Sequence, residues 1–170
     1  MTPRPQENEF AEYYGRYINR VPEGDLVEIL ESQLTYVKSL LNTVSESDSN
    51  VVHPPYTWTI KQVIGHVIDV ERVFAYRALR WASADSRSII GMEQDDWVAN
   101  TDWSTPSLSM LRDEFLLCRE ANLHMFKRLT PESWSRGGHA DGGFMTVRAA
   151  AHCMAGHLIH HGTIIESRLA

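Results

Sequence analysis

The amino-acid sequence predicts an all-α protein, a bundle of four long helices. Four segments repeat apolar residues at steps of three and four positions, which is the period of an amphipathic helix. Prolines, glycines or polar runs separate these segments, and neither a strand pattern nor an internal repeat interrupts them. At 170 residues the chain is long enough for one core, so we expect a single domain over residues 1–170.

The first long helix is predicted over residues 26–45, preceded by a tyrosine-rich arm over residues 1–23. Asp25 is a suitable N-cap, because a carboxylate accepts hydrogen bonds from the free N–H groups of the first turn. The buried stripe is expected to consist of Leu26, Ile29, Leu30, Leu34, Val37, Leu40, Leu41 and Val44. Residues 45–55 are polar and end in two prolines, so this stretch is predicted to be a connection.

The second helix is predicted over residues 60–84, with Thr59 as its N-cap. Many of its residues are β-branched, which would also suit a strand. A length of about seven turns, with no break other than Gly65, decides for a helix. Residues 85–106 follow as a long connection with scattered aromatic residues, a kind of segment that is often functional inside a compact domain.

The third helix is predicted over residues 107–129 and ends before Pro131, because proline disfavours helical geometry in the residue that precedes it. Residues 135–143 are rich in glycine and are predicted to form a turn or loop. The fourth helix is predicted over residues 146–169. Both cysteines of the chain fall inside the last two helices, so we expect them to be reduced and packed rather than joined in a disulfide.

The composition restricts the classes of function. A formal net charge of -6, with no stripe of Lys and Arg, argues against a nucleic-acid partner, because phosphate binding needs concentrated positive charge. The first residues lack the basic and apolar regions of a secretory signal, and no run of about 18 apolar residues suggests a membrane span. We therefore expect a cytoplasmic protein without a membrane partner.

Histidines in the fourth predicted helix carry the main chemical signal. His157 and His161 are one turn apart and lie within about 40° of each other on the helix surface, whereas His160 is turned about 60° the other way. The first two are thus a natural chelating pair. Eight histidines in a chain of this length would produce roughly 0.4 such pairs by chance, so the pair needs a third partner.

His66 is the candidate third partner. It lies in the middle of the second predicted helix among apolar residues, where an imidazole without a partner would be costly. Taken alone, His66 also fits a core histidine whose hydrogen bonds are satisfied. Together with the pair on the fourth helix, it favours a metal site, since bundle interiors bind metals through side chains of facing helices. Cys153 lies one turn before His157 and is either a fourth ligand, a reactive thiol or a small packed residue.

Two motifs resemble the DinB-like (DinB/YfiT) superfamily. The segment 58–72, with its Trp, short helix start and His followed by an acidic residue, resembles that family's second helix. The segment 147–161 resembles its closing helix, in which one histidine is followed three and four residues later by two more. The resemblance covers nearly the whole chain, including the tyrosine-rich arm.

The resemblance implies a four-helix bundle in up-down-down-up order, frequently a homodimer, with a metal bound by His66, His157 and His161. His160 is not a ligand in the family pattern. The superfamily includes transferases and isomerases that depend on a low-molecular-weight thiol, as well as members without an assigned activity. The implied partner is therefore a small-molecule substrate together with such a thiol.

Three neutral imidazoles leave the double charge of a divalent ion in place and occupy only part of its coordination sphere. Water or a thiol bound there would lose a proton near neutral pH and become a nucleophile. Zinc and nickel both suit imidazole ligands, and the sequence does not choose between them. Asp69, one turn beyond His66, is a candidate catalytic residue that would orient an imidazole or accept a proton, although a solvated or capping carboxylate fits it as well.

Other residues have weaker indications of a role. Three acidic residues of the long connection have two interpretations: they border the opening of the site, or they are only solvated. Two tryptophans either line a pocket or close the end of the bundle. These are Glu93, Asp95, Asp96, Trp58 and Trp97. The leading prediction is a metal-dependent thiol S-transferase, followed by a metal-dependent hydrolase. The alternative is a non-enzymatic metal-binding or sensing bundle.

Overall fold

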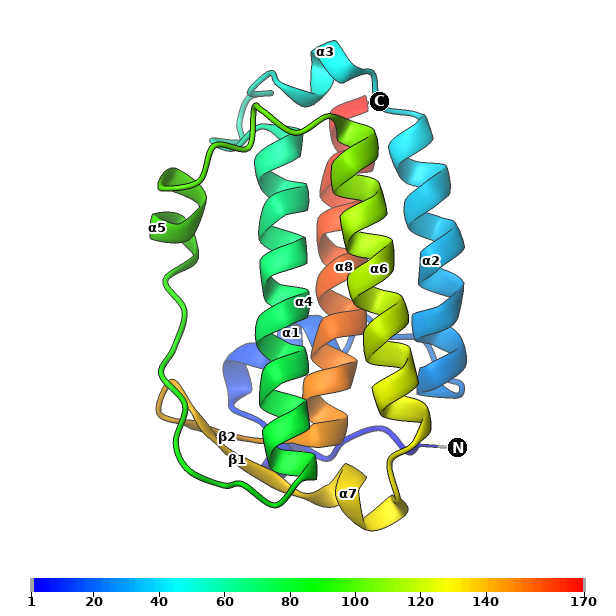
Figure 1. The fold of residues 1–170 in the computed structure, drawn as a ribbon, viewed down its shortest axis with the longest axis vertical. Coiled ribbons are helices and arrows are strands. Elements are labelled where there is room, and N and C mark those ends of the chain that lie inside the picture. Colours follow the sequence, from blue (N-terminus) through cyan, green and yellow to red (C-terminus); the bar gives the residue numbers. More distant parts are fainter. Residues whose placement is uncertain (1, 170) are drawn as a thin grey trace.

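Four long helices, antiparallel in part, make up the body of the computed structural model, which describes residues 2–169 (Figure 1). They are α2 (Leu26–Asn42), α4 (Ile60–Ala82), α6 (Leu108–Lys127) and α8 (Val147–Leu169). α2 and α8 run in one direction and α4 and α6 in the other, which is the up-down-down-up order (Figure 1). The predicted bundle is therefore confirmed. Met1 and Ala170, the ends of the predicted domain, lie outside the described residues.

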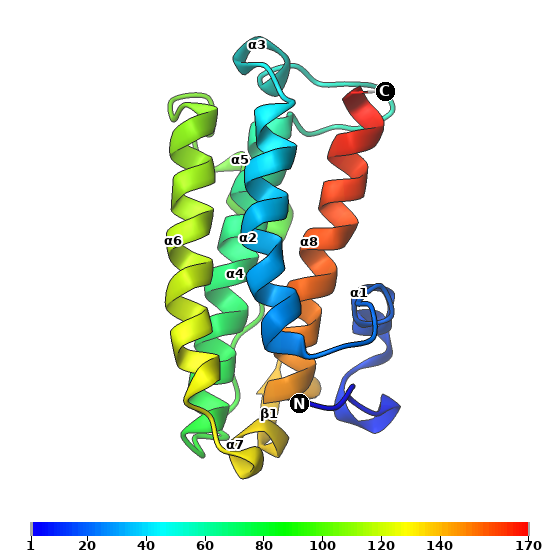
Figure 2. The ribbon, with the colours of Figure 1, turned by 90° about the vertical axis from the view of Figure 1, so that its right-hand side faces the viewer.

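The order of the helices follows from one long connection. α4 and α6 are consecutive and parallel, so the chain between them must return along the whole bundle, and it carries the short helix α5 (Gln94–Ala99) on the way (Figure 1). α4 packs against both α6 and α8, and α2 packs against the same two helices from the other side (Figure 2). The long connection predicted over residues 85–106 thus crosses from one end of the bundle to the other.

The helices begin where the sequence predicts. The Asp25 side chain accepts from the backbone N–H groups of Val27 and Glu28. Thr59 and Gln62 form a reciprocal capping box at the start of α4. Shorter helical elements occupy the arm and the bundle ends. They are η1 (Glu7–Glu9), η2 (Glu12–Tyr14), α1 (Gly15–Ile18), α3 (Glu46–Ser49) and α7 (Pro131–Ser135).

A β-hairpin corrects the prediction of a loop over residues 135–143 and of a chain without strands. β1 (Gly137–Ala140) pairs antiparallel with β2 (Gly143–Thr146). Asp141 and Gly142 between them both have positive φ, 52° and 74°, as in the tight turns that join two strands. The strands are too short and too rich in glycine for an alternating pattern to reveal them, whereas the Asp-Gly pair is the sequence signal that indicates a hairpin.

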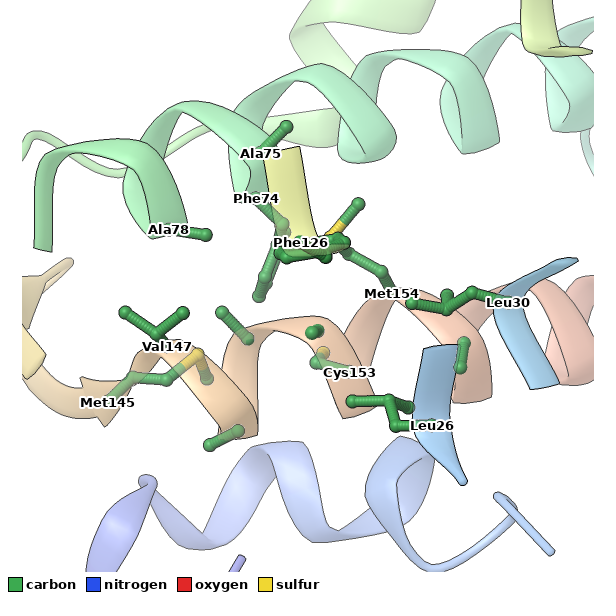
Figure 3. Packing of buried hydrophobic residues seen from close by; sticks show 14 of the residues in the cluster. Leu26, Leu30, Phe74, Ala75, Ala78, Phe126, Met145, Val147, Cys153 and Met154 are labelled. Atoms are coloured by element: carbon green, nitrogen blue, oxygen red, sulfur yellow. The ribbon is translucent and has the colours of Figure 1, made fainter. Parts of the chain in front are cut away.

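The core is built from small and large side chains that interdigitate at the hairpin end of the bundle. Phe126 of α6 lies beside Phe74 of α4, in the space between α4 and the part of α8 that carries Cys153 (Figure 3). Both cysteines are free, as predicted, and Cys153 is buried. None of the described helices combines the length and the apolar character that crossing a membrane requires.

A buried polar network joins all four helices. The guanidinium of Arg119, fully buried in α6, donates to both carboxylate oxygens of Glu71 at 2.7 and 2.9 Å. Arg119 also donates to the Gln33 amide oxygen, and the Gln33 amide donates in turn to the Ala155 carbonyl at 2.8 Å. Asn122 donates to Glu71 from the next turn of α6. This network therefore sets the relative height of the helices that carry the histidines.

Candidate metal centre

Three imidazoles from two facing helices meet in the middle of the bundle. His66 extends from α4, and His157 and His161 extend from successive turns of α8. The His157 Nε2 atom lies 3.0 Å from Nε2 of His66 and 3.1 Å from Nε2 of His161. The structure thus brings together the three residues that the sequence selects as ligands, and among the described residues they form the one group of donors close enough to share an ion.

The geometry fits a shared metal ion. Two imidazole nitrogens that each lie about 2.0–2.1 Å from one ion, at angles near 90–110°, are separated by about 3.0–3.4 Å. The contacts at His157 have this separation. Nδ1 of both His66 and His161 is buried without a hydrogen-bond partner in the described chain, so the rings are oriented by packing rather than by carboxylates. Trp58 packs on His66, with 5.3 Å between the ring centroids, and Tyr17 packs on His157 at 5.1 Å.

Burial keeps the imidazoles in their neutral form. Removal from water lowers the pKa of His66 to about 4 and that of His161 to about 3. Burial also lowers the pKa of His157 far below its usual range, and the three neighbouring histidines add to this. All three side chains are therefore unprotonated near pH 7, which is the state that binds a metal.

The lowered pKa values predict an acid-sensitive fold in the metal-free protein. Between about pH 6.5 and pH 4 the unfolded chain takes up protons that the folded histidines do not, so the free energy of unfolding falls with the pH. We expect a loss of about 1–3 kcal/mol per pH unit in urea unfolding experiments at pH 7 and pH 5. His157→Gln is expected to make the loss smaller, whereas His124→Gln, at an exposed position of α6, is not. Equal losses in wild type and His157→Gln would contradict this explanation.

A cavity of about 430 Å³ opens beside two of the histidines. Its wall comes from the arm, α4, the long connection, the hairpin and α8, and includes Tyr17, His66, Val70, Phe74, Cys153 and His157. Such a volume is typical of sites for small molecules. Glu93 and Asp95 line the cavity, which agrees with the prediction that acidic residues of the long connection border the site. Asp96 and Trp97 do not line it.

The remaining candidates lie around this centre. An oxygen of Asp69 is 3.7 Å from Arg72 on the next turn of α4, and the carboxylate is not among the described residues that line the cavity. Burial raises the pKa of Asp69, but its catalytic role stays a prediction. Cys153 is buried in the cavity wall, and burial strongly raises the pKa of its thiol, so it is neutral. His160 packs on Tyr17 and takes no part in the cluster of donors.

Glycines beside the histidines allow neighbouring elements to approach. A Cβ atom on Gly65 would lie 2.5 Å from the Trp103 indole, and one on Gly156 would lie 2.0 Å from the Tyr17 carbonyl oxygen. Gly156 thereby allows α1 to pack directly on α8 at the position before His157. The sequence did not identify Tyr17 as a neighbour of the site. The only signal was the glycine that directly precedes each of His66 and His157, which allows a close approach of another element at that position.

Gly156→Ala is expected to displace α1, because the new methyl group meets backbone rather than a flexible side chain. We expect a loss of about 1–3 kcal/mol in the free energy of unfolding, together with weaker metal binding once Tyr17 leaves His157. Gly15→Ala in α1 is the matched control, since its Cβ would meet nothing closer than 3.7 Å. Urea unfolding and metal titration check both variants. A Gly156→Ala protein as stable as Gly15→Ala would contradict the close approach.

Comparisons with known proteins agree with this architecture. The family model of the DinB superfamily matches residues 29–165. No curated protein matches the chain. YfiT from Bacillus subtilis, described as a probable metal-dependent hydrolase with an unusual four-helix bundle topology, has a similar structure, with a TM-score of 0.76 at 18% identity. The match covers 86% of this chain and 90% of YfiT.

A second similar structure is that of a mycothiol-dependent maleylpyruvate isomerase. It matches with a TM-score of 0.62 at 13% identity over 85% of this chain, which spans 61% of the isomerase. A histidine-to-alanine mutant of that enzyme matches with a TM-score of 0.63 at 12% identity. At these low sequence identities the structural matches show a shared fold only. The match to the family model, in contrast, extends over most of the sequence. The chain belongs to the DinB superfamily.

Proposed function

We propose that this protein is an enzyme that binds a divalent metal ion through His66, His157 and His161 and uses it to activate a thiol or water. The observation that carries the proposal is the convergence of three neutral imidazole nitrogens, with two of the three histidines lining a cavity. A bound ion would lower the pKa of a thiol or water so that a nucleophile forms near neutral pH. Zinc and nickel are the proposed ions, because both suit imidazole ligands.

The protein's own residues determine what reaches the ion. Three neutral ligands would leave the charge of a bound ion uncompensated and part of its coordination sphere free for a thiol or water. Val70 and Phe74 line the cavity beside His66 and offer apolar surface to the carbon chain of a thiol, which favours a thiol over water. We therefore prefer a thiol S-transferase to a hydrolase. Among proteins of similar fold, one is a mycothiol-dependent isomerase and another a probable metal-dependent hydrolase, so both thiol-dependent and hydrolytic activities are described for this fold.

The alternative is a bundle that binds metal for stability or sensing. In that case the ligands would be expected in a sealed site, whereas His66 and His157 line a cavity of about 430 Å³. The cavity therefore favours the enzyme. Asp69 does not line the cavity, so we propose that it affects the reaction only indirectly, by its position on the helix that carries His66. Asp69→Asn is expected to change the rate of the reaction less than any change at a histidine.

The experiment begins with elemental analysis of protein purified without added metal, for which we expect about one ion per chain. The protein is then loaded with Co²⁺ and titrated with small thiols, and binding is followed by the thiolate-to-cobalt absorption band. A screen of electrophiles with the thiol bound follows. Metal in the protein without any change in the cobalt spectrum would favour the hydrolase or the sensing bundle. Absence of metal would contradict the whole proposal.

We also propose that the protein is a cytoplasmic homodimer without a nucleic-acid partner. Two large apolar side chains, Met110 and Leu117, are 62% and 68% exposed two turns apart on α6, and a second copy would cover them. Light scattering in solution measures the mass of the particle. A monomer at high protein concentration would contradict this part of the proposal and leave the metal site unaffected.

A further inference from the structure

A second positively charged group lies in the same cavity. Arg77 of α4 is only 3% exposed and lines the cavity that reaches His66 and His157. Its Nε atom is buried without a hydrogen-bond partner, and no carboxylate of the described chain lies within ion-pair distance of its guanidinium. Such burial is unusual for an arginine unless it is paired.

The helix places Arg77 and His66 on one face. His66, Val70, Phe74 and Arg77 follow one another at steps of four, four and three residues, and all four side chains line the cavity. The helix rises about 16 Å from the first to the last of them. The guanidinium lies over the Phe74 ring, 5.0 Å from its centroid, so the arginine side chain extends back toward His66. The cavity therefore has histidines at one end, apolar side chains in the middle and a cation at the other end.

Arg77 lacks the carboxylate partner that neutralises Arg119, the other buried arginine described above. Arg119 is equally buried and is neutralised by both oxygens of Glu71. Arg77 instead lies over the Phe74 ring and is close enough to Tyr14 for a side-chain hydrogen bond, which opposes the rise in the pKa of Tyr14 on burial. Neither group carries a negative charge that would neutralise the guanidinium. Carboxylates do line the cavity, but they belong to exposed residues at its rim, which water stabilises. These residues are Glu93, Asp95 and Asp141.

We propose that Arg77 binds an oxyanion, preferably a carboxylate, of the small molecule whose other end reaches the three histidines. This inference rests on the proposed function and names its substrate class: a molecule with a metal-binding group such as a thiol, an apolar middle and an anionic end. The planar guanidinium suits such a group because it donates two parallel hydrogen bonds to a carboxylate or phosphate.

The experiment uses ω-mercapto carboxylic acids of three to six carbons, each paired with the ω-mercapto alcohol of the same length. Their dissociation constants for the cobalt-loaded protein are measured from the absorption spectrum. For the acid whose length fits, we expect binding about tenfold or more tighter than for its alcohol. Cysteamine, a thiol with a positive charge, tests the opposite preference, namely attraction of a cation to the carboxylates at the rim. Tighter binding of cysteamine than of every acid would mean that the rim carboxylates dominate, and would overturn the inference.

Two variants assign the preference to Arg77. Arg77→Met keeps a long apolar side chain over Phe74 and is expected to bind acid and alcohol equally. Arg72→Met removes the same charge from an exposed, ion-paired position of α4 and is expected to keep the preference. An Arg77→Met protein that folds and still prefers the acid would overturn the inference.

A metal-free measurement separates this inference from the proposed function. In nitrogen-15-labelled wild-type protein without metal, the Arg77 Nε–H resonance is followed on addition of hexanoate, hexanol or inorganic phosphate. We expect a saturable shift with hexanoate, a smaller one with phosphate and none with hexanol. If no thiol binds the cobalt-loaded protein but hexanoate shifts this resonance, the proposed function fails and the anion site stands. If thiols bind and the resonance does not respond to any anion, Arg77 is structural only.

Discussion

Replacing His157 with alanine is expected to lower the affinity for a divalent metal by about two to three orders of magnitude. The Nε2 atom of His157 lies 3.0 and 3.1 Å from those of the other two histidines, so its loss leaves only two imidazoles to hold the ion. Each ligand of a protein zinc site contributes several kcal/mol to binding. Zinc titration against a competing chelator measures the change. The thermal stabilisation that zinc confers on the wild type should be lost in the same variant.

His160→Ala is the matched control for this experiment. It removes an imidazole from the same helix, three residues away, and the side chain contacts Tyr17 but does not belong to the cluster of donors. We expect its metal affinity to equal that of the wild type. A His157→Ala protein that binds zinc as tightly as His160→Ala would refute the proposed metal centre. An unchanged affinity in His160→Ala would agree with the exclusion of His160 from the ligands that helical geometry suggests.

The second large effect is expected at the buried network rather than at the site. Arg119→Met should lower the free energy of unfolding by about 3–5 kcal/mol, because the Glu71 carboxylate then remains buried without its partner. Glu71 and Arg119 are 2% and 0% exposed, so water cannot replace the lost hydrogen bonds without opening the bundle. Such a loss is a large part of the stability of a domain of this size. Urea unfolding at pH 7 measures it.

The double variant Glu71→Leu with Arg119→Met distinguishes the two contributions of this network. Replacing both charges with apolar side chains removes the unpaired carboxylate, so we expect the double variant to recover at least about half of the loss. If the double variant were less stable than Arg119→Met alone, the cost would arise from lost packing instead. Metal titration of the double variant also tests whether the Gln33 contact to Ala155, near His157, keeps α8 in position.

The helices could be predicted from the sequence because their signals are local. The three- and four-residue spacing of apolar side chains marks the buried stripe of each helix, and Asp25 and Thr59 mark two of the starts through hydrogen bonds to residues close by. The hairpin was missed because its strands have only four residues each, and its glycines produce no alternation. Its turn residues, Asp141 and Gly142, held the missing signal.

Local patterns were enough to predict the helical architecture and the candidate ligands, since periodicity selects His157 and His161, and an apolar setting singles out His66. Tertiary packing was needed to bring α4 and α8 to the height at which Nε2 of His157 lies 3.0 Å from that of His66 and 3.1 Å from that of His161. The cavity enclosed there by the arm and the hairpin, and the burial of Arg77 in it without an acidic partner, also became visible only in the folded chain. These features depend on contacts between residues distant in the chain, and a periodic pattern carries no information about such contacts.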